Sequence, residues 1–352
     1  MTSSSDATTP PAIILGGEAN ALAVARDLGR IGVAVYVLST SSQGARHSRY
    51  AQGIDIEPRE WKTFLLGPES NYLRGAVLLT CSDHGIQFLV ANREALRRKY
   101  KLDLSDPVAQ IAMLDKLQTY EHGRAAGVPT PRFWKVGSVE QIRELRAELV
   151  FPLVVKPRLS HIFERAFGRK HVIVRDFDEL LQVLARIRAA QIDVLLMEYI
   201  PGGDDQLCSY YTYLDETGTP QFHFTKRIIR RYPANMGAAC YHITDWIPEL
   251  IEPANALFRR VGLRGLANVE FKLDPRDGQY KLIEVNARFT ASNCLVSRSG
   301  FNLAVFVYNR LTDQPSPMMA YRETQLRLWD PLRDLLAFLE SAGVKEHAAF
   351  SK

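Results

Sequence analysis

From Ala12 onward the chain shows a pattern that few folds can accommodate. A short apolar run is followed by a glycine turn, an amphipathic helical stretch and a second apolar run: AIILGG at 12–17, EANALAVARDLGRIG at 18–32 and VAVYVLST at 33–40. Apolar strands that alternate with helices form a parallel sheet that the helices cover. The sequence therefore predicts that the chain begins with a parallel α/β unit.

A glycine turn in such a unit raises the alternative of a dinucleotide site and a Rossmann-type oxidoreductase. The segment GGEANAL lacks the third glycine of that fingerprint. The second strand ends in Ser39 and Thr40, where an acidic residue would be needed to bind the ribose. We do not expect NAD to bind, and a failure to bind NAD or NADP would exclude this alternative.

Length, charge and composition narrow the class of protein. A chain of 352 residues is long enough for two or three packed units. The net charge of +5 is mild and comes without a dense basic run, so we do not expect a nucleic-acid partner. The four cysteines are far apart and form no CxxC pair, which argues against a zinc or disulfide framework and favours the cytoplasm.

The N-terminal segment 1–11, MTSSSDATTPP, is polar and lacks a signal-peptide pattern, so we expect a disordered tail. No apolar run approaches the roughly 18 residues that a membrane span requires. We therefore expect no membrane association.

The first unit is expected to continue to Asp106. A strand, GAVLLT at 75–80, precedes Asp83, which we interpret as a helix cap, with a ligand contact as the alternative. A helical stretch after 105–107 carries Asp115 and Lys116 and ends near GVPTPRFW at 127–134.

The second half has the pattern of an α+β unit. The strands FPLVVKP at 151–157, HVIV at 171–174 and VLLMEYI at 194–200 flank a helix at 177–191. Two hairpins are expected, at 209–229 and at 268–286, and an amphipathic helix is expected within 328–343.

The run KLIEVNARFTAS at 281–292 places Glu284, Asn286 and Arg288 at alternate positions, and alternate side chains of a strand share a face. The second hairpin brings Glu270 opposite Glu284 and Asn286. A single acid on a strand is more often a solvated partner of a basic neighbour. Two carboxylates and an amide oxygen on one face instead favour a magnesium site.

Two further motifs are weak when taken alone. Lys156 ends an apolar strand, where a lysine usually extends to solvent but can also bind phosphate. The segment MEYIPGGDD at 197–205 is either an ordinary strand exit with solvated Asp204 and Asp205, or a ligand-binding hinge.

Taken together and in this order, these motifs resemble the ATP-grasp superfamily, from Ala12 to about Phe338. The resemblance implies α/β and α+β architecture, an ATP-grasp fold with an N-terminal Rossmann-like (pre-ATP-grasp) domain. It implies a tail at 1–11, the Rossmann-like domain at 12–106, a small ATP-grasp subdomain or lid at 107–190, and a C-terminal subdomain with the metal site at 191–352.

The resemblance also implies roles for single residues. Lys116 and Lys156 would hold the ATP phosphates, and Glu270, Glu284 and Asn286 would hold Mg²⁺, with Mn²⁺ as a substitute. The backbone of Glu198 and Ile200 would contact adenine. Asp204 or, second, Asp205 would bind the ribose. Arg288 matches the arginine that stabilises an acyl-phosphate or an oxyanion, so the expected catalytic residues are Arg288 and Lys156.

One segment departs from the common pattern, because a loop rich in glycine and serine is replaced by RLSHIFERAFGRKHVIV at 158–174. The KP-x-x-SH motif with its later GRK, and RRYPANMG at 230–237, are similar to the branch of D-aspartate ligase-like carboxylate-amine ligases. Lys170 would then contact phosphate through its charge. Which of His161, Arg165 and Lys170 reaches the nucleotide stays open.

The basic run TKRIIRRYP at 225–233 has two interpretations. It is either a charged strand edge that discourages edge pairing, or a site where Lys226, Arg227 or Arg230 faces phosphate or a substrate carboxylate. Arg227 and Arg230 are the candidate substrate ligands.

The expected function is therefore that of a cytoplasmic ATP-dependent ligase, which joins a small carboxylate to an amine through an acyl-phosphate and releases ADP and phosphate. Amino acids are the substrate class that the resemblance implies, and a homodimer is left open. The alternative is a nucleotide-binding sensor of the same fold without turnover. The complete set from Glu270 to Arg288 argues against it, because a pure binder has no use for an oxyanion group.

Overall fold

The computed structural model describes residues 9–159, 163, 166–168, 170–235 and 237–341. Two compact units make up the chain: Met1–Ile111 with Arg288–Glu323, and Ala112–Ala287 with Thr324–Lys352. The tail expected at 1–11 lies outside the described residues up to residue 8. The division at 106 and 190 stays a prediction.

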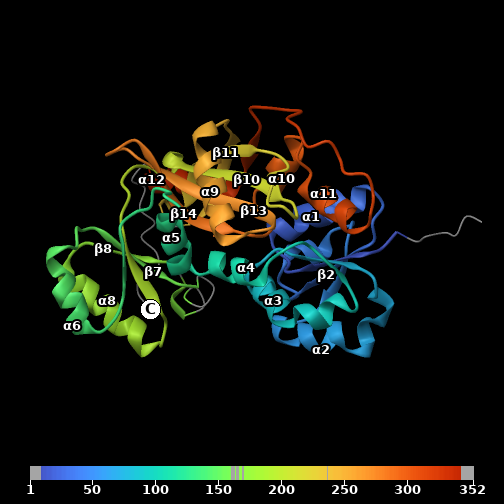
Figure 1. Ribbon diagram of the computed structural model, residues 1–352, viewed down its shortest axis with the longest axis horizontal. Helices are drawn as coiled ribbons and strands as arrows, with labels where there is room; N and C mark the ends of the chain where they lie inside the picture. Colours follow the sequence, from blue (N-terminus) through green and yellow to red (C-terminus); the bar gives the residue numbers. More distant parts are fainter. Residues whose placement is uncertain (1–8, 160–162, 164–165, 169, 236, 342–352) are drawn as a thin grey trace, which may run out of the picture. The chain divides into compact units, whose positions relative to one another are not determined.

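The first unit contains a five-stranded parallel sheet in the order β3-β2-β1-β4-β5, which confirms the parallel α/β prediction. The inner strands of this sheet, β1, β2 and β4, are largely buried, and Trp61, at 2% exposure, packs into the core with Leu15 and Leu78. Figure 1 shows α10 and α11, from the later part of the chain, beside α1. The elements are β1 (Ala12–Leu15), α1 (Ala19–Arg30), β2 (Val35–Ser39), β3 (Gln52–Asp55), α2 (Trp61–Leu66), β4 (Val77–Thr80), α3 (Asp83–Arg97), β5 (Lys101–Leu102), α10 (Asn293–Arg298) and α11 (Leu303–Leu311).

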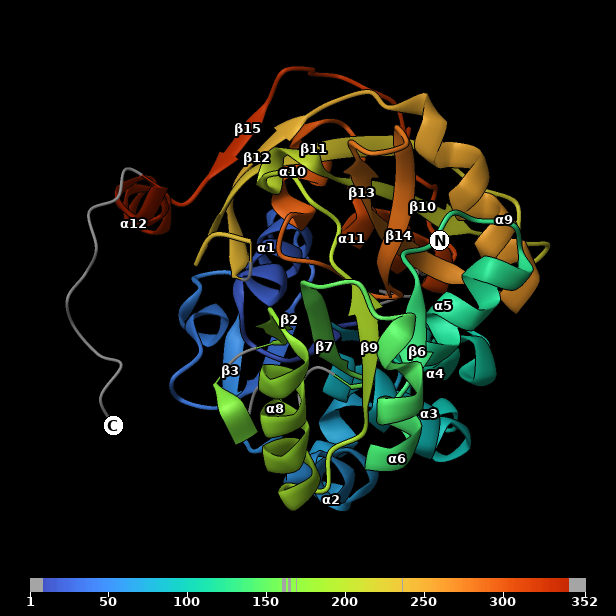
Figure 2. The same cartoon turned by 90° about the vertical axis from the view of Figure 1, so that its left-hand side faces the viewer.

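The second unit contains two sheets, and the smaller one has the antiparallel order β6-β9-β7-β8. Figure 2 shows α6 and α8 on the same side of this sheet. Their apolar residues, among them Ile142, Leu180 and Leu184, form one core with Leu153 and Leu196 of the strands. The elements are α5 (Lys116–Ala125), β6 (Phe133–Lys135), α6 (Val139–Glu144), β7 (Leu153–Pro157), β8 (Val172–Val174), α8 (Phe177–Ala189) and β9 (Val194–Glu198).

The larger sheet has the order β14-β13-β10-β11-β12-β15. Both expected hairpins are present, as the antiparallel pairs β10–β11 and β13–β14, and the expected terminal helix is α12. The elements are β10 (Leu207–Leu214), β11 (Phe224–Tyr232), β12 (Ala238–Thr244), α9 (Ile251–Val261), β13 (Gly265–Asp274), β14 (Gln279–Asn286), β15 (Arg327–Trp329) and α12 (Pro331–Ser341).

Two local predictions need correction. The helical stretch expected around Asp115 is two helices, α4 (Pro107–Leu114) and α5, because the Asp115 carboxylate caps α5 by accepting from the N–H groups of Leu117 and Gln118. Helix α3 is capped by the Ser82 hydroxyl, which accepts from the Gly85 N–H, and Asp83 is the first helical residue.

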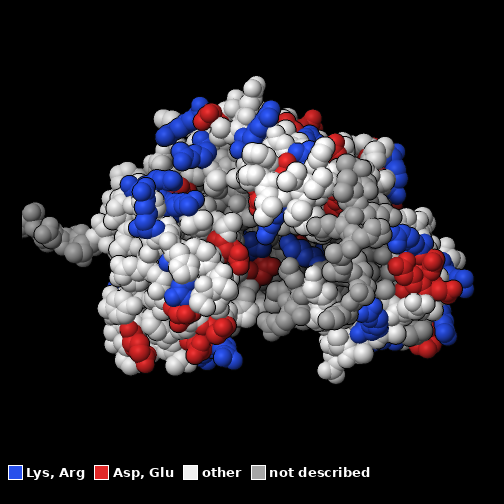
Figure 3. Space-filling model, turned by 180° about the vertical axis from the view of Figure 1, so that it is seen from behind, with Lys and Arg blue, Asp and Glu red and all other residues white. Residues whose placement is uncertain are grey.

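The distribution of charged side chains on the surface is consistent with the mild net charge of +5. On the face that Figure 3 shows, basic and acidic residues are interspersed. Within the described part of the chain, every helix is too short or too polar to cross a membrane.

Candidate active site

A row of polar residues crosses the larger sheet of the second unit. Strand register sets Lys226 of β11 opposite Ser209 of β10, Ser209 opposite Glu270 of β13, and Glu270 opposite Glu284 of β14. Directly opposed residues project from the same face of a sheet. The two carboxylates predicted as metal ligands are therefore brought together, with Lys226 on the same face.

A β-bulge in β14 sets this arrangement. Glu270 pairs with Glu284 but Phe271 pairs with Leu282, so Ile283 is the extra residue. The extra residue reverses the alternation, so that Leu282 enters the core while Glu284 faces the polar row. The Ile283 carbonyl is left outside the ladder, where it accepts hydrogen bonds from Tyr120 Oη at 2.7 Å and from Lys156 Nζ at 3.0 Å.

The electrostatics of the two carboxylates indicate a place for a cation. Burial, and then the neighbouring Glu284 carboxylate, raise the pKa of Glu270 above its ordinary value. Lys116 Nζ lies 3.8 Å from Glu284 Oε2, but among the described residues no cation lies within ion-pair distance of Glu270. A divalent ion between the two carboxylates would relieve this repulsion.

Asn286 supplies a third oxygen. It lies opposite Asn268, whose side-chain N–H donates to the Tyr210 carbonyl at 3.1 Å. The Asn268 oxygen therefore accepts from Asn286 Nδ2 at 3.2 Å, which leaves Asn286 Oδ1 available as a ligand. In the described parts of the chain no three His, Cys, Asp or Glu residues are grouped to hold a metal. Two carboxylates and an amide oxygen nevertheless fit Mg²⁺, which takes its remaining ligands from water and substrate phosphates.

Two lysines lie next to this row, at the positions predicted from the sequence. Lys156, 7% exposed, ends in a buried cluster where Nζ donates to Tyr120 Oη and the Ile283 carbonyl, each at 3.0 Å. Burial lowers its pKa. Lys116 begins α5 directly after the cap residue Asp115, which also pairs with Arg158, the second residue after Lys156. This pair ties the start of α5 to the end of β7.

A cavity in the second unit adjoins Lys156. Its apolar wall suits a planar base, and its cationic groups suit phosphates. Burial, and then the nearby Lys156, lower the pKa of His171 to about 4, so this imidazole is neutral near pH 7. The lining residues are Val154, Lys156, His171, Ile173, Met197, Tyr199, Ile200, Leu207, Arg231, Asn235, Lys272 and Ile283.

The hinge after β9 is held by Lys272. Its buried Nζ donates to the carbonyls of Ile200 and Gly202, both at 2.9 Å, and burial lowers its pKa to about 8. Glu198 is 8% exposed, and its carboxylate accepts from the Arg132 backbone N–H at 3.1 Å and from Arg276 at 2.8 Å. The hinge proposed for adenine is thus fixed by a lysine and two arginines.

The two candidate ribose acids differ in availability. The Asp204 carboxylate accepts from Arg231 Nε at 2.7 Å, from the Arg231 backbone N–H at 2.9 Å and from the Asn235 N–H at 3.2 Å. Asp205 is exposed, and its backbone carbonyl, rather than its carboxylate, accepts from Arg227. The geometry favours Asp205 as the free acid.

The basic run on β11 divides between the two faces of the sheet. Lys226, 1% exposed, faces the polar row, contacts His242 Nδ1 at 3.2 Å, and has a pKa lowered by burial to about 8. Arg227 is opposite Cys208, one position off the row, and pairs with Asp245 at 2.7 Å. Arg230 binds Asp334 of α12 through two contacts at 2.6 and 2.8 Å. The structure does not bring the last two to the row.

Four other predicted residues are either not part of this row or lie outside the described residues. Arg288 belongs to the first unit, where its Nε donates to Asp83 at 2.6 Å. Lys170 is exposed, and its charge is near enough to Glu270 to favour the ionised form of that carboxylate. His161 and Arg165 lie outside the described residues.

Sequence reasoning missed Tyr120, His171, Asn268 and Lys272. For two of them a signal existed, because Asn268, Glu270 and Lys272 alternate along β13 as Glu284 and Asn286 do along β14. Tyr120 and His171 carry no such pattern, since only the folded chain places them against Lys156.

Comparison with known proteins finds relatives in sequence and in fold. Residues 227–330 match the family model described as ATP-grasp in the biosynthetic pathway with Ter operon. The D-aspartate ligase of Enterococcus faecium is 26% identical over 345 residues, which cover 90% of this chain and 81% of that protein.

Two solved structures share the fold. The N5-carboxyaminoimidazole synthetase from Staphylococcus aureus in complex with ADP has a TM-score of 0.67 at 18% identity, covering 88% of this chain and 78% of that one. The L-amino acid ligase from Bacillus licheniformis has a TM-score of 0.63 at 17% identity, covering 88% and 75%. The chain therefore has the ATP-grasp fold of these structures, and its sequence is similar to ATP-grasp proteins, among them a D-aspartate ligase.

Proposed function

We propose that the protein is an ATP-dependent ligase that joins a small carboxylate to an amine through an acyl-phosphate. The observation that carries the proposal is the opposed pair Glu270 and Glu284, with Lys116 3.8 Å from Glu284 and Lys156 held at the adjoining bulge. Amino acids are the proposed substrate class, because related proteins are named a D-aspartate ligase and an L-amino acid ligase.

Glu270, Glu284 and Asn286 would hold Mg²⁺, with Mn²⁺ as a substitute. The fit rests on the buried Glu270 carboxylate opposite Glu284 and on the Asn286 oxygen described above. When bound, the ion neutralises charge on the β and γ phosphates of ATP.

For the nucleotide, we assign the phosphates to Lys116 and Lys156, with Lys170 as a further contact. The apolar cavity beside Lys156 would take the adenine against the backbone of Glu198 and Ile200. The Ile200 carbonyl already accepts a hydrogen bond from Lys272. We assign this bond to holding the hinge in place and not to binding the adenine. The ribose is assigned to Asp205 ahead of Asp204, whose carboxylate is occupied by Arg231.

The reaction needs no nucleophilic side chain. An oxygen of the substrate carboxylate forms a bond to the γ-phosphorus while the bond to the β–γ bridging oxygen breaks, and ADP leaves. The amine nitrogen then attacks the acyl carbon, loses a proton, and phosphate leaves with the electron pair. We propose that Arg288 stabilises the oxyanion of this second step, as preorganised donors do in acyl transfer.

The test is ADP release measured against a panel of amino acids and other small carboxylates, each with and without amines. Hydroxylamine should replace the amine and trap the acyl-phosphate as a hydroxamate. Glu284→Gln removes one anionic metal ligand and should abolish ADP release without unfolding the protein. The matched control is Glu249→Gln, an exposed acid elsewhere in the unit, which should retain activity.

The outcomes separate the ligase from the sensor. Near-normal ADP release by Glu284→Gln at ordinary magnesium would show that the metal assignment is wrong. If no carboxylate yields ADP or hydroxamate, the sensor is favoured. Arg288→Ala should bind ATP like the parent and form hydroxamate far more slowly, by about 2.7 to 4 kcal/mol in the barrier.

A cytoplasmic location, a homodimer and the absence of a nucleic-acid partner remain part of the proposal. Size-exclusion chromatography with light scattering would determine the oligomeric state.

A further inference from the structure

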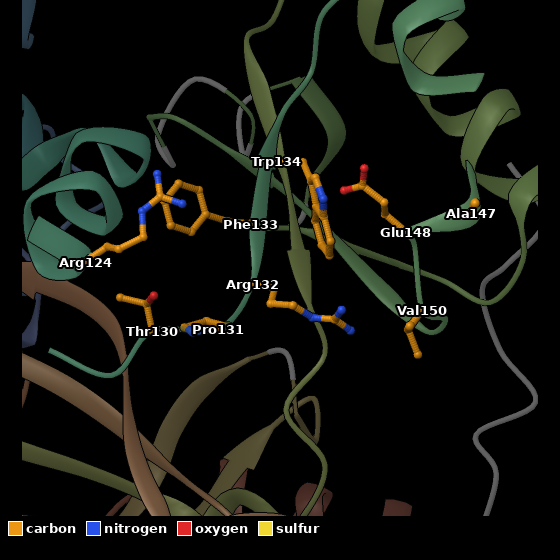
Figure 4. A pocket seen from close by; sticks show the side chains of 9 residues that line it. All are labelled: Arg124, Thr130, Pro131, Arg132, Phe133, Trp134, Ala147, Glu148 and Val150. Atoms are coloured by element: carbon orange, nitrogen blue, oxygen red, sulfur yellow. The ribbon is translucent and has the colours of Figure 1, made fainter. Parts of the chain in front are cut away.

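A second hollow lies on the outer side of β6, the edge strand of the smaller sheet, and has a volume of about 480 Å³. Figure 4 shows Arg132 and Trp134 on the side of β6 that faces Glu148 and Val150, while Phe133 faces Arg124. The full lining is Arg124, Thr130, Pro131, Arg132, Phe133, Trp134, Ala147, Glu148 and Val150. A hollow of this size is large enough for a small ligand.

The arginines of this hollow are not fully paired with carboxylates among the described residues. Glu198 Oε1 lies 2.8 Å from Arg276 but 3.9 Å from Arg132, so Arg276 already neutralises this carboxylate and Arg132 is only loosely held. Arg124 stacks over the Phe133 ring at 4.7 Å, and no carboxylate of the described residues is within ion-pair distance of it. On the side of β6 that faces Glu148 and Val150, the Arg132 guanidinium is thus available to an external carboxylate, which arginine binds through two parallel bonds.

The rest of the wall limits the kind of ligand. Arg132 lies over the Trp134 ring at 5.7 Å, and Val150, although apolar, is 54% exposed, so an apolar surface is present beside the cations. Glu148 is the one acid in the lining, and it would repel a phosphate dianion while accepting hydrogen bonds from an ammonium group.

We propose that this hollow binds a small amino acid with an apolar side chain. Its carboxylate contacts Arg132, its ammonium group contacts Glu148, and its side chain lies against Trp134 and Val150. This site is separate from the polar row of the larger sheet, and its binding does not depend on the proposed reaction.

The hollow is also connected to the candidate nucleotide residues. The Arg132 backbone N–H donates to the Glu198 carboxylate at 3.1 Å, and the Glu198 N–H donates to the Arg132 carbonyl at 2.8 Å. Phe133 packs on Tyr120, with ring centroids 5.4 Å apart, and Tyr120 holds Lys156. A ligand carboxylate bound to Arg132 brings its own negative charge near the hinge, so it should weaken binding of the anionic ATP. Unlike the binding itself, this coupling rests on the proposed function.

The experiment is isothermal titration calorimetry without ATP, using leucine, isocaproate (the same molecule without the ammonium group) and isoamylamine (the same molecule without the carboxylate). Leucine should bind, and both analogues should bind more weakly. Arg132→Ala and Glu148→Gln should each weaken leucine about tenfold, the usual scale for a lost charge-assisted contact. The control is Arg143→Ala, an exposed arginine of α6 that does not line the hollow and should leave binding unchanged.

The result that overturns the site is leucine binding equal in the parent, Arg132→Ala and Glu148→Gln, or no binding to the parent. Isocaproate binding as tightly as leucine would refute an amino acid as the ligand. Glu148 is exposed and its replacement is isosteric, so this variant tests the site even if Arg132→Ala destabilises the hinge.

A second titration measures the coupling. Saturating leucine should weaken ATP about fivefold or more, and ATP should weaken leucine by the same factor. Leucine binding without an effect on ATP would refute the coupling but keep the site. An absence of ATP binding would instead count against the proposed function.

Discussion

Replacing Tyr120 by Phe should weaken ATP binding although Tyr120 need not touch the nucleotide. The hydroxyl is buried, donates to the Ile283 carbonyl at 2.7 Å and accepts from Lys156 Nζ at 3.0 Å. Burial raises the pKa of Tyr120 far above its ordinary value, so it stays a neutral donor over the working pH range. The substitution removes one of the two groups that direct Lys156.

The size of the effect follows from the two lost bonds. A neutral hydrogen bond contributes about 0.5 to 1.5 kcal/mol, and one to a charged group about 1.5 to 3 kcal/mol. The Ile283 carbonyl keeps its bond from Lys156, and the ring contact with Phe133 remains. We expect a loss of about 2 to 4 kcal/mol in the free energy of unfolding. We also expect about tenfold weaker ATP binding, as a single misdirected contact typically costs.

The assay combines urea unfolding with ATP titration by calorimetry. The matched control is Tyr100→Phe in the first unit, because Tyr100 Oη is also buried and also makes two bonds, to the Leu65 carbonyl at 2.8 Å and to Ser70 Oγ at 2.9 Å. Tyr100→Phe should lose stability but keep its affinity for ATP.

Two results would refute the reasoning. If Tyr120→Phe binds ATP within twofold of the parent, Lys156 is either not directed by Tyr120 or not a nucleotide ligand. If Tyr100→Phe loses as much affinity as Tyr120→Phe, the loss reflects general destabilisation.

Two further predictions concern aspartates of the second unit. Asp204→Ala removes the buried partner of Arg231 and should lower the free energy of unfolding by about 3 to 5 kcal/mol. Asp205→Ala should leave the free energy of unfolding unchanged and weaken ATP binding. Urea unfolding and calorimetry separate the two effects, and the reverse pattern would show that the ribose assignment is wrong. Bonds from Arg276, and then from Lys281, hold the pKa of Asp274 well below its ordinary 3.8, so its stabilisation is present above pH 3.8 and is lost as the pH falls through the lowered value. Urea unfolding over a pH series should therefore show a flatter acid limb in Asp274→Asn, and an unchanged acid limb would contradict this cause.

The sequence predicted most elements whose pattern is local. The order AIILGG, helix, VAVYVLST was enough to predict a parallel sheet, because apolar strands between helices have few other ways to be covered. Alternation along a strand likewise predicted that Glu284 and Asn286 share a face, since side-chain direction depends on backbone geometry alone. Where two local signals competed, at Asp115 and at Ser82 and Asp83, the prediction was wrong, because cap geometry depends on which side chain reaches the free N–H groups.

The tertiary structure decided what is adjacent to what. The pairing of Glu270 with Glu284, the bulge that frees the Ile283 carbonyl, and the approach of Tyr120 to Lys156 join segments that lie far apart in sequence, so no local pattern specifies them. The same holds for Arg227 and Arg230, which alternation alone left open. Their partners Asp245 and Asp334 come from other elements, and such contacts exist only once the chain has packed.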